Sequence, residues 1–214
     1  ARPFAGWISF PDPHTPYEVP RAWADTVPPA SVDLPPREAP DADLPERTRV
    51  LQRLNGVDDV AEADLRGLIA TYHAQVRFVD DGLRRVLDVL DATGLAASTL
   101  VVFCADHGDF AGEHGMTRKG GALYDCLVRV PLLVAGPGVP AGVVEPSPVS
   151  LVDVVPTLLA LQGLPVPAAM QGRPLPGATD APARDATFAE LGAGGPACTR
   201  ADLDCLGLGG GLEA

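Results

Sequence analysis

The chain has 214 residues, which is enough for one α/β domain with a sizeable core and a tight fit for two. Its 16 basic and 28 acidic residues give a formal net charge of −12, which argues against a nucleic-acid binder that relies on a basic surface. No apolar run approaches the roughly 18 residues that a membrane-spanning helix requires. Composition therefore predicts a globular chain whose partners are neither nucleic acid nor a membrane.

A short buried strand is the first element that the sequence predicts. Residues 4–10 form an apolar run rich in aromatic and β-branched side chains, and Pro11 ends it. The 35 residues that start at Pro11 contain ten prolines, which exclude a long helix or a central strand. Tyr17 and Trp23 favour a long loop that packs against the surface, and loops of this length are usually lids or linkers.

A long amphipathic helix is predicted next, because apolar residues recur at i, i+3, i+4 and i+7 from Leu65 to Leu90. Thr93 and Gly94 have the chemistry of a helix C-cap. Residues 99–105 are apolar at successive positions, which predicts a buried strand with parallel neighbours. The order strand, helix, strand then implies a right-handed crossover.

Two more elements are predicted after a glycine-rich loop. Residues 130–135 are predicted as a buried strand, and residues 152–161 as a short helix with Pro156 inside its first turns. Cys104 lies inside the strand predicted over 99–105, where a buried and unreactive thiol is the expected state. The four cysteines show no spacing typical of a zinc site.

Asp106 and His107 come directly after the strand predicted over 99–105. In open α/β sheets, ligands bind in the crevice beyond the carboxyl ends of the strands. A carboxylate and an imidazole there can hold a divalent cation, and Gly108 allows the backbone to turn tightly. The same residues also fit a plain turn in which Asp106 is the cap and His107 lies on the surface.

The loop that follows has the composition of an anion-binding segment. Lys119 stands in a stretch with four glycines, which let a backbone approach an anionic ligand that the lysine would pair with. A solvated loop lysine is the alternative. His114 fits a group that orders the loop by hydrogen bonding better than it fits a catalyst.

His14 lies at the carboxyl end of the first predicted strand, so it can face the same crevice. Pro13 and Pro16 restrict the backbone around it, and a rigidly held histidine is suited to donate a proton or a hydrogen bond to a leaving group. An exposed turn histidine is an equally good interpretation. On the predicted helix, His73 and the pair Asp80 and Asp81 are interpreted as structural or solvated.

Taken together, these motifs resemble the sulfatase family of the alkaline phosphatase superfamily, including its phosphonate monoester hydrolase relatives. The resemblance covers about residues 3–175 and implies a three-layer α/β/α sandwich with a mostly parallel sheet. Its segments stand in family order: PFAGWISFPDPHTPY, YHAQVRFVDDGLRRVLDVLDATGLAASTLVVFCADHGDFAGEHG, KGGALYDCLVRVPLLVAGPGVPAG and VSLVDVVPTLLALQGLPVP. A weaker likeness is found in FAELGAGGPACT.

The resemblance implies a role for four residues. Asp106 and His107 match the family's ligands for one divalent cation, which is usually calcium and sometimes magnesium or manganese. Lys119 matches the lysine that contacts sulfate or phosphate oxygens, and His14 matches the histidine that contacts the transferred group and assists the leaving oxygen. The cation and Lys119 would then stabilise the equatorial negative charge while His14 stabilises the departing alkoxide.

The sequence departs from the family pattern at the nucleophile. The family uses a formylglycine made from Cys or Ser in a C-x-P-S-R or S-x-P-x-R motif, and this sequence contains neither motif. We therefore expect a fragment, inactive alone, whose partner is the N-terminal half of the same fold. Residues 1–175 would be the C-terminal part of the catalytic domain, with a proline-rich loop over 11–60, and residues 176–214 a truncated, loop-rich tail.

The leading hypothesis is a sulfatase that hydrolyses small-molecule sulfate monoesters. Phosphonate monoester or phosphodiester hydrolysis keeps the same metal, lysine and histidine and is the nearest alternative. A degenerate homologue without catalysis and a subunit of a split enzyme are two further hypotheses.

Overall fold

The computed structural model describes residues 2–36 and 44–191 and shows the α/β structure that the sequence predicts. The chain divides into two compact units. Unit 1 comprises Ala1–Val79, Asp109–Leu127 and Glu190–Ala214, and unit 2 comprises Asp80–Gly108 and Val128–Ala189. None of the described helices is both long enough and apolar enough to span a membrane.

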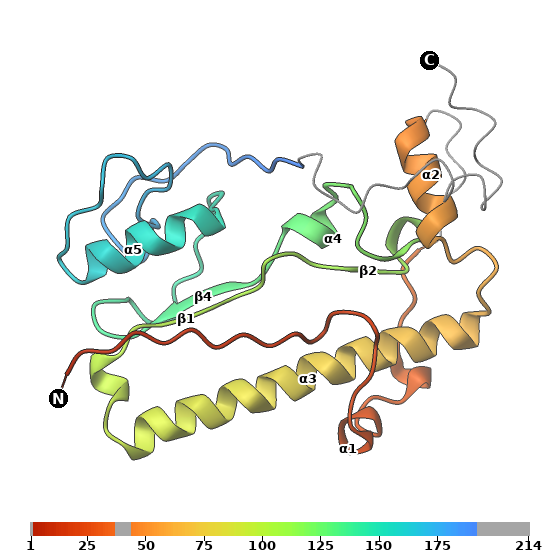
Figure 1. Ribbon diagram of the computed structural model, residues 1–214, viewed down its shortest axis with the longest axis horizontal. Helices are drawn as coiled ribbons and strands as arrows, with labels where there is room; N and C mark the ends of the chain where they lie inside the picture. Colours follow the sequence, from red (N-terminus) through yellow and green to blue (C-terminus); the bar gives the residue numbers. More distant parts are fainter. Residues whose placement is uncertain (1, 37–43, 192–214) are drawn as a thin grey trace. The chain divides into compact units, whose positions relative to one another are not determined.

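Unit 1 is built against the first turns of helix α3 (Glu62–Ala92), which carries the predicted amphipathic pattern. In its described part, residues 11–36, the proline-rich segment forms no long helix or strand, as predicted, and contains helix α1 (Arg21–Ala24) and the 3-10 turn η1 (Pro29–Ser31) (Figure 1). This segment packs on α3, and its Trp23 ring meets Phe78 edge-on at a centroid distance of 5.0 Å. The shared core is apolar: Val27, Val32, Val57, Leu65, Ile69, Ala70 and Ala74.

Helix α2 (Glu46–Asn55) lies inside the segment 11–60 that was predicted as loop. The helix is short and polar, and its few apolar residues show no clear period, so the local pattern does not predict it. It begins directly after Pro45, the last of these prolines. Side chains of α2 reach the loop near His114, since Gln52 Nε2 donates a hydrogen bond to the His114 carbonyl at 3.2 Å.

A small hairpin completes unit 1. Strands β2 (Phe110–Ala111) and β3 (Thr117–Arg118) pair antiparallel, and the 3-10 turn η3 (Glu113–Gly115) joins them. Helix α4 (Asp125–Val128) follows the hairpin. Phe110, Met116 and Leu127 form the second core of the unit and fix the hairpin on the rest of it.

Unit 2 contains the predicted strands 99–105 and 130–135 as β1 (Val101–Cys104) and β4 (Leu132–Ala135). They pair antiparallel, with Val101 opposite Ala135 and Cys104 opposite Leu132. The prediction of parallel neighbours is therefore wrong for this pair. Apolar residues at successive positions report burial, whereas strand direction depends on the path of the connecting chain, which the pattern does not encode.

The first predicted strand does not form within the described residues. Residues 4–10 are extended chain without ladder hydrogen bonds, and Phe4, Trp7 and Ile8 are 63%, 89% and 62% exposed. An apolar run becomes a strand only where a neighbouring strand accepts and donates its backbone hydrogen bonds. The crossover predicted from this strand to β1 is accordingly not seen.

The predicted helix ends are confirmed. Helix α3 ends at a left-handed Gly94 with φ of +69°, and Leu95 N donates to the Leu90 carbonyl at 2.9 Å, which satisfies a terminal acceptor. A short 3-10 turn, η2 (Ala96–Ser98), leads into β1. The helix predicted over 152–161 is present as the 3-10 turn η4 (Leu151–Asp153) and helix α5 (Val154–Leu161).

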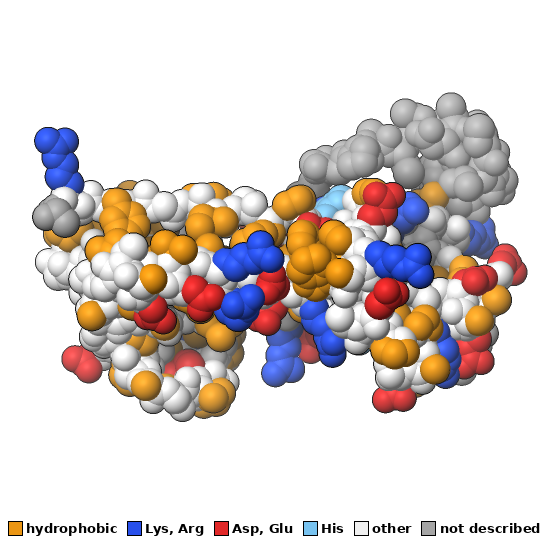
Figure 2. Space-filling model, turned by 90° about the horizontal axis from the view of Figure 1, so that it is seen from below, with side chains coloured by type: hydrophobic (Ala, Val, Ile, Leu, Met, Phe, Trp, Pro, Cys, Tyr) orange, Lys and Arg blue, Asp and Glu red, His pale blue; other side chains and the backbone are white. Residues whose placement is uncertain are grey.

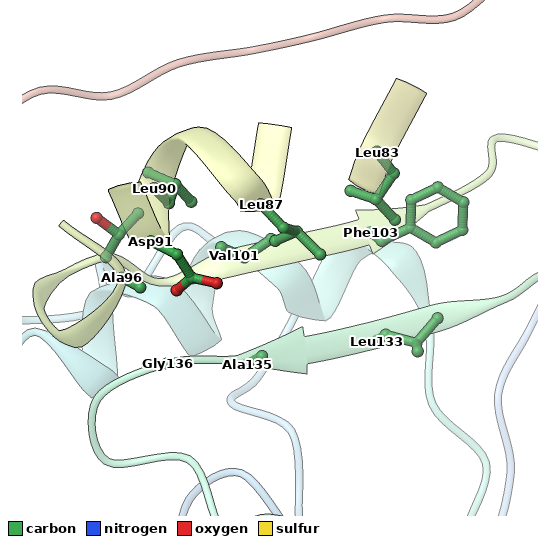
Figure 3. Close-up of a pocket in the computed structure, with 11 residues that line it drawn as sticks. Leu83, Leu87, Leu90, Asp91, Ala96, Val101, Phe103, Leu133, Ala135 and Gly136 are labelled. Carbon is green, nitrogen blue, oxygen red and sulfur yellow. The ribbon is translucent and has the colours of Figure 1, made fainter. Parts of the chain in front are cut away.

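An apolar cavity of about 340 Å³ lies between the last turns of α3 and the two strands of unit 2. Leu83, Leu87 and Leu90 point from the helix toward Val101, Phe103 and Leu133 (Figure 3). Asp91 is the one carboxylate among its lining residues. None of the predicted site residues lines this cavity, and most of its lining side chains are apolar. We therefore assign it no role in binding or catalysis.

Charged side chains on the last turns of α3 are arranged in ion pairs. Arg84 contacts Asp81 at 2.6 Å and Asp88 at 3.0 Å, and Arg85 contacts Asp81 at 2.8 Å. These contacts lower the pKa of Asp81, first through the hydrogen bond from Arg84. Figure 2 shows acidic and basic side chains lying next to one another on one face of the molecule.

Cys104 is exposed at the end of β1, so the prediction of a buried thiol is wrong. Cys126 in α4 is the more protected of the two described cysteines: burial, and then the Glu113 carboxylate, raise the pKa of its thiol to about 11. Iodoacetamide reacts with the thiolate, and a rise in pKa of about two lowers the thiolate fraction roughly 100-fold near pH 8. We expect peptide mass mapping to show Cys104 alkylated well before Cys126, with equal rates in denaturant. Equal rates in the native protein would contradict the exposure of these two residues.

Candidate functional site

His14 and Lys119 come together in unit 1. The Nζ atom of Lys119 lies 3.1 Å from Nε2 of His14, although 105 residues separate them in the chain. His14 stands in a tight turn in which its own N–H donates to the Pro11 carbonyl at 3.0 Å. Lys119 directly follows β3, and it is the only lysine in the sequence. Both side chains are exposed, so a ligand in solution can reach them.

The hydrogen bonds of the His14 ring define its tautomer. Nδ1 contacts the Thr15 carbonyl oxygen, and because a carbonyl only accepts, Nδ1 carries the hydrogen. In the neutral ring Nε2 then holds a lone pair and accepts a hydrogen bond from the Lys119 ammonium. The contact therefore places a fixed positive charge beside a ring nitrogen that can take up a proton.

A half-buried hydrogen bond supports the segment that carries His14. The Tyr17 hydroxyl donates to Oδ2 of Asp109 at 3.1 Å, and the Tyr17 ring meets Tyr72 edge-on at 5.9 Å. Burial, and then the Asp109 charge, raise the pKa of Tyr17 above its ordinary value near 10. The pKa of Tyr72 is raised by burial, Asp109 and Glu113. Asp109 was not among the predicted site residues.

Replacing Tyr17 with Phe is expected to destabilise the protein in a pH-dependent way. At pH 8 the loss of the hydrogen bond to a carboxylate should cost about 1–2 kcal/mol. Above about pH 10, tyrosine ionises in the unfolded chain while Tyr17 stays protonated in the folded one, so this contribution to stability falls as pH rises. The difference between wild type and Tyr17→Phe should therefore shrink between pH 8 and pH 11 in urea unfolding. A constant difference would contradict the raised pKa.

Asp106 and His107 lie in unit 2 directly after β1, as predicted. Oδ1 of Asp106 accepts from the His107 backbone N–H at 2.9 Å, and Oδ2 lies 3.6 Å from His107 Nε2. Nδ1 of His107 is 2.8 Å from the Gly108 carbonyl, so Nδ1 carries the hydrogen and Nε2 is the ring nitrogen with metal-binding capacity. The Asp106 side chain is 88% exposed and that of His107 35%.

The chemistry of this pair fits a divalent cation. A carboxylate oxygen and an imidazole nitrogen that approach each other this closely can bind one ion together, and the Nδ1 contact is the usual way in which a ligating histidine is oriented. Within residues 2–36 and 44–191, no group of three or more His, Cys, Asp or Glu side chains could hold a metal. Asp106 and His107 are thus a pair of candidate ligands, and the part of the chain that the structure describes adds no third His, Cys, Asp or Glu beside them.

His114 orders the hairpin loop through its ring. It adopts a left-handed backbone with φ of +54° and stacks on Tyr124 at a centroid distance of 4.1 Å. Phe110 meets the same ring edge-on at 6.1 Å. The loop-ordering role predicted for His114 agrees with this ring packing.

Comparison with known proteins identifies relatives over most of the chain. The family model described as Sulfatase matches residues 1–164. A sulfatase from Formosa agariphila is 35% identical, over 76% of this chain and 33% of its own length. A choline-sulfatase from Rhizobium meliloti is 33% identical, over 76% of this chain and 32% of its own length.

A solved structure extends the likeness to the fold. The phosphonate monoester hydrolase SpPMH from Silicibacter pomeroyi superimposes with a TM-score of 0.67 at 31% identity, over 76% of this chain and 34% of that protein. The chain spans about a third of the length of the curated relatives that it matches. Its fold is the α/β fold of the alkaline phosphatase-like sulfatases, and the chain belongs to the sulfatase family.

Proposed function

We propose that the protein to which this chain contributes hydrolyses sulfate monoesters of small molecules. The observation that carries the proposal is the 3.1 Å approach of Lys119 to His14 in a chain of the sulfatase family. The relatives named sulfatase and choline-sulfatase support the choice of sulfate esters.

The two side chains have separate tasks in the proposed reaction. The Lys119 ammonium pairs with an oxygen of the sulfate group, where negative charge develops in the transition state. When the Lys119 ammonium pairs with the sulfate, it no longer donates to His14 Nε2. His14 Nε2 then takes a proton from water and donates it to the leaving oxygen, which avoids the expulsion of a free alkoxide. The Thr15 carbonyl keeps Nδ1 protonated and thereby directs Nε2 toward the substrate side.

Asp106 and His107 are the proposed ligands of a divalent cation, calcium first and magnesium or manganese as alternatives. Such a cation supplies charge stabilisation of the transferred group as a Lewis acid. The 3.6 Å approach of Asp106 Oδ2 to His107 Nε2 supports their joint use. The sequence has no C-x-P-S-R or S-x-P-x-R motif, so we propose that another segment of the whole protein supplies the formylglycine nucleophile.

Hydrolysis of phosphonate monoesters is a second candidate. SpPMH, a phosphonate monoester hydrolase, is the observation that favours it, because its structure covers three quarters of this chain. A tetrahedral phosphonate carries oxygens that Lys119 and a cation would bind in the same way, so the two candidates differ in substrate and not in the roles of these residues.

The full-length protein tests both candidates. Its rates with 4-nitrophenyl sulfate and with a 4-nitrophenyl phosphonate monoester should be compared before and after chelation, and again after calcium, magnesium or manganese is restored. We expect kcat/KM to be higher for the sulfate, to fall on chelation and to recover with one of these ions. A higher value for the phosphonate would establish the second candidate. Absence of hydrolysis in a protein with an intact nucleophile motif would overturn both and favour a degenerate homologue.

A further inference from the structure

One buried amide connects both ends of the segment that carries His14. Gln75 on α3 is fully buried, and its Nε2 donates to Oδ1 of Asp12 and to the Glu18 carbonyl, each at 3.2 Å. An amide nitrogen has two hydrogens. The Gln75 amide donates one to Asp12 and the other to Glu18, the residues on either side of the His14 turn. The helix thus holds the segment at its entry and at its exit.

This connection matters because the His14 ring is exposed and has little packing of its own. Its place beside Lys119 depends on the backbone of residues 12–18. Gln75 holds this segment through the Asp12 side chain at one end and the Glu18 carbonyl at the other, and the hydrogen bond from Tyr17 to Asp109 adds a third contact. The Gln75 contacts are the pair that fixes the separation of those ends.

The carbonyl oxygen of the same amide makes Gln75 a costly residue at this buried position. Among the described residues, Gln75 Oε1 is buried without a hydrogen-bond partner, and a buried acceptor in that state costs about 1–3 kcal/mol. Methionine has a similar length and would avoid the cost. We propose that Gln75 is a positioning residue for His14, retained for its two donated hydrogen bonds.

That Gln75 matters for catalysis rests on the proposed function. The position of His14 can be measured without any assay of activity. In protein labelled with ¹³C-lysine, the ε-methylene signal that disappears in Lys119→Arg belongs to Lys119, and it senses the nearby imidazole ring of His14. We expect Gln75→Met and Gln75→Glu to move this signal toward its position in His14→Ala. Glu should act more strongly, since its carboxylate faces two acceptors.

Two further variants keep the result interpretable. Gln162→Met is the matched control, because Gln162 at the end of α5 donates one hydrogen bond, to the Leu158 carbonyl at 2.8 Å, and should leave the signal in place. Asp12→Ala removes one of the two acceptors from outside the core, so it tests the link even if a substitution at Gln75 prevents folding. An unmoved Lys119 signal in Asp12→Ala and in every Gln75 variant that keeps the wild-type circular dichroism would overturn the inference.

Activity of the full-length protein gives a second readout. If Gln75→Met displaces His14 from its contact with the transition state, kcat should fall roughly 10- to 100-fold with little change in KM. If Gln75 acts through His14, the loss should be larger for an alkyl sulfate than for 4-nitrophenyl sulfate, whose leaving group needs no proton. An equal loss for both esters would mark Gln75 as merely structural. A moved Lys119 signal in a protein whose wild type hydrolyses no ester would support the positioning and overturn the proposed function.

Discussion

Lys119→Ala should lower kcat/KM of the full-length protein for sulfate esters by about 10²–10³-fold. Loss of one charged group that stabilises a transition state typically has an effect of this size. The ammonium lies beside His14 and no other lysine exists in the chain to replace it. Steady-state kinetics with 4-nitrophenyl sulfate would measure the effect, and the thermal unfolding midpoint should change little because the side chain is exposed.

A matched control for this experiment is Arg21→Ala. Arg21 is also an exposed cation of unit 1, and its ion pair is with Asp25, one helical turn away, at 3.6 Å. This variant should retain the wild-type rate, which separates the local role of Lys119 from a general effect of net charge. If Lys119→Ala kept the wild-type rate as well, the proposed role of the lysine would be wrong.

Asp153→Ala should destabilise unit 2 by about 3–5 kcal/mol, the range observed when one partner of a buried ion pair is removed. Asp153 is 2% exposed, accepts hydrogen bonds from the backbone N–H groups of Ser150 and Arg173, and pairs with the Arg184 guanidinium. Its removal leaves the largely buried Arg184 charge without its carboxylate. Urea unfolding followed by circular dichroism would measure the change.

The comparison variant is Asp88→Ala on the exposed side of α3. Asp88 also pairs with an arginine, Arg84, at 3.0 Å, but its side chain is 62% exposed. Exposed pairs one helical turn apart contribute about 0.5 kcal/mol or less. A similar loss of stability in both variants would show that burial does not decide the value of the Asp153 contacts.

The helices and the two strands of unit 2 could be predicted because their side-chain patterns are local. Helix α3, β1, β4 and α5 all lie where apolar periodicity or apolar runs place them. The direction in which β1 and β4 pair, and whether residues 4–10 form a strand, depend on which segments lie beside them. The local side-chain pattern does not contain that information. Helix α2 was missed because it is short and polar.

The site was predictable in part for the same reason. Asp106 and His107 are candidates because of their place after a strand, whereas the contact of His14 with Lys119 joins distant parts of the chain. For that contact the sequence indicated only that His14 can face the same crevice, and the family resemblance gave both residues a role. Gln75 does have a local signal in the sequence. It is a polar residue beside Ala74 and one turn before Val79, on the face of α3 that is buried.

The single lysine has a practical consequence for anyone who handles the protein. Amine-reactive dyes, biotin esters and aldehyde fixatives modify lysine side chains and the chain's amino terminus, and in this sequence the only lysine is Lys119. Immobilisation of this chain through a side-chain amine would therefore cover the proposed anion-binding residue. Conversely, protection of the peptide that contains Lys119 from acetylation would show that a ligand occupies that residue.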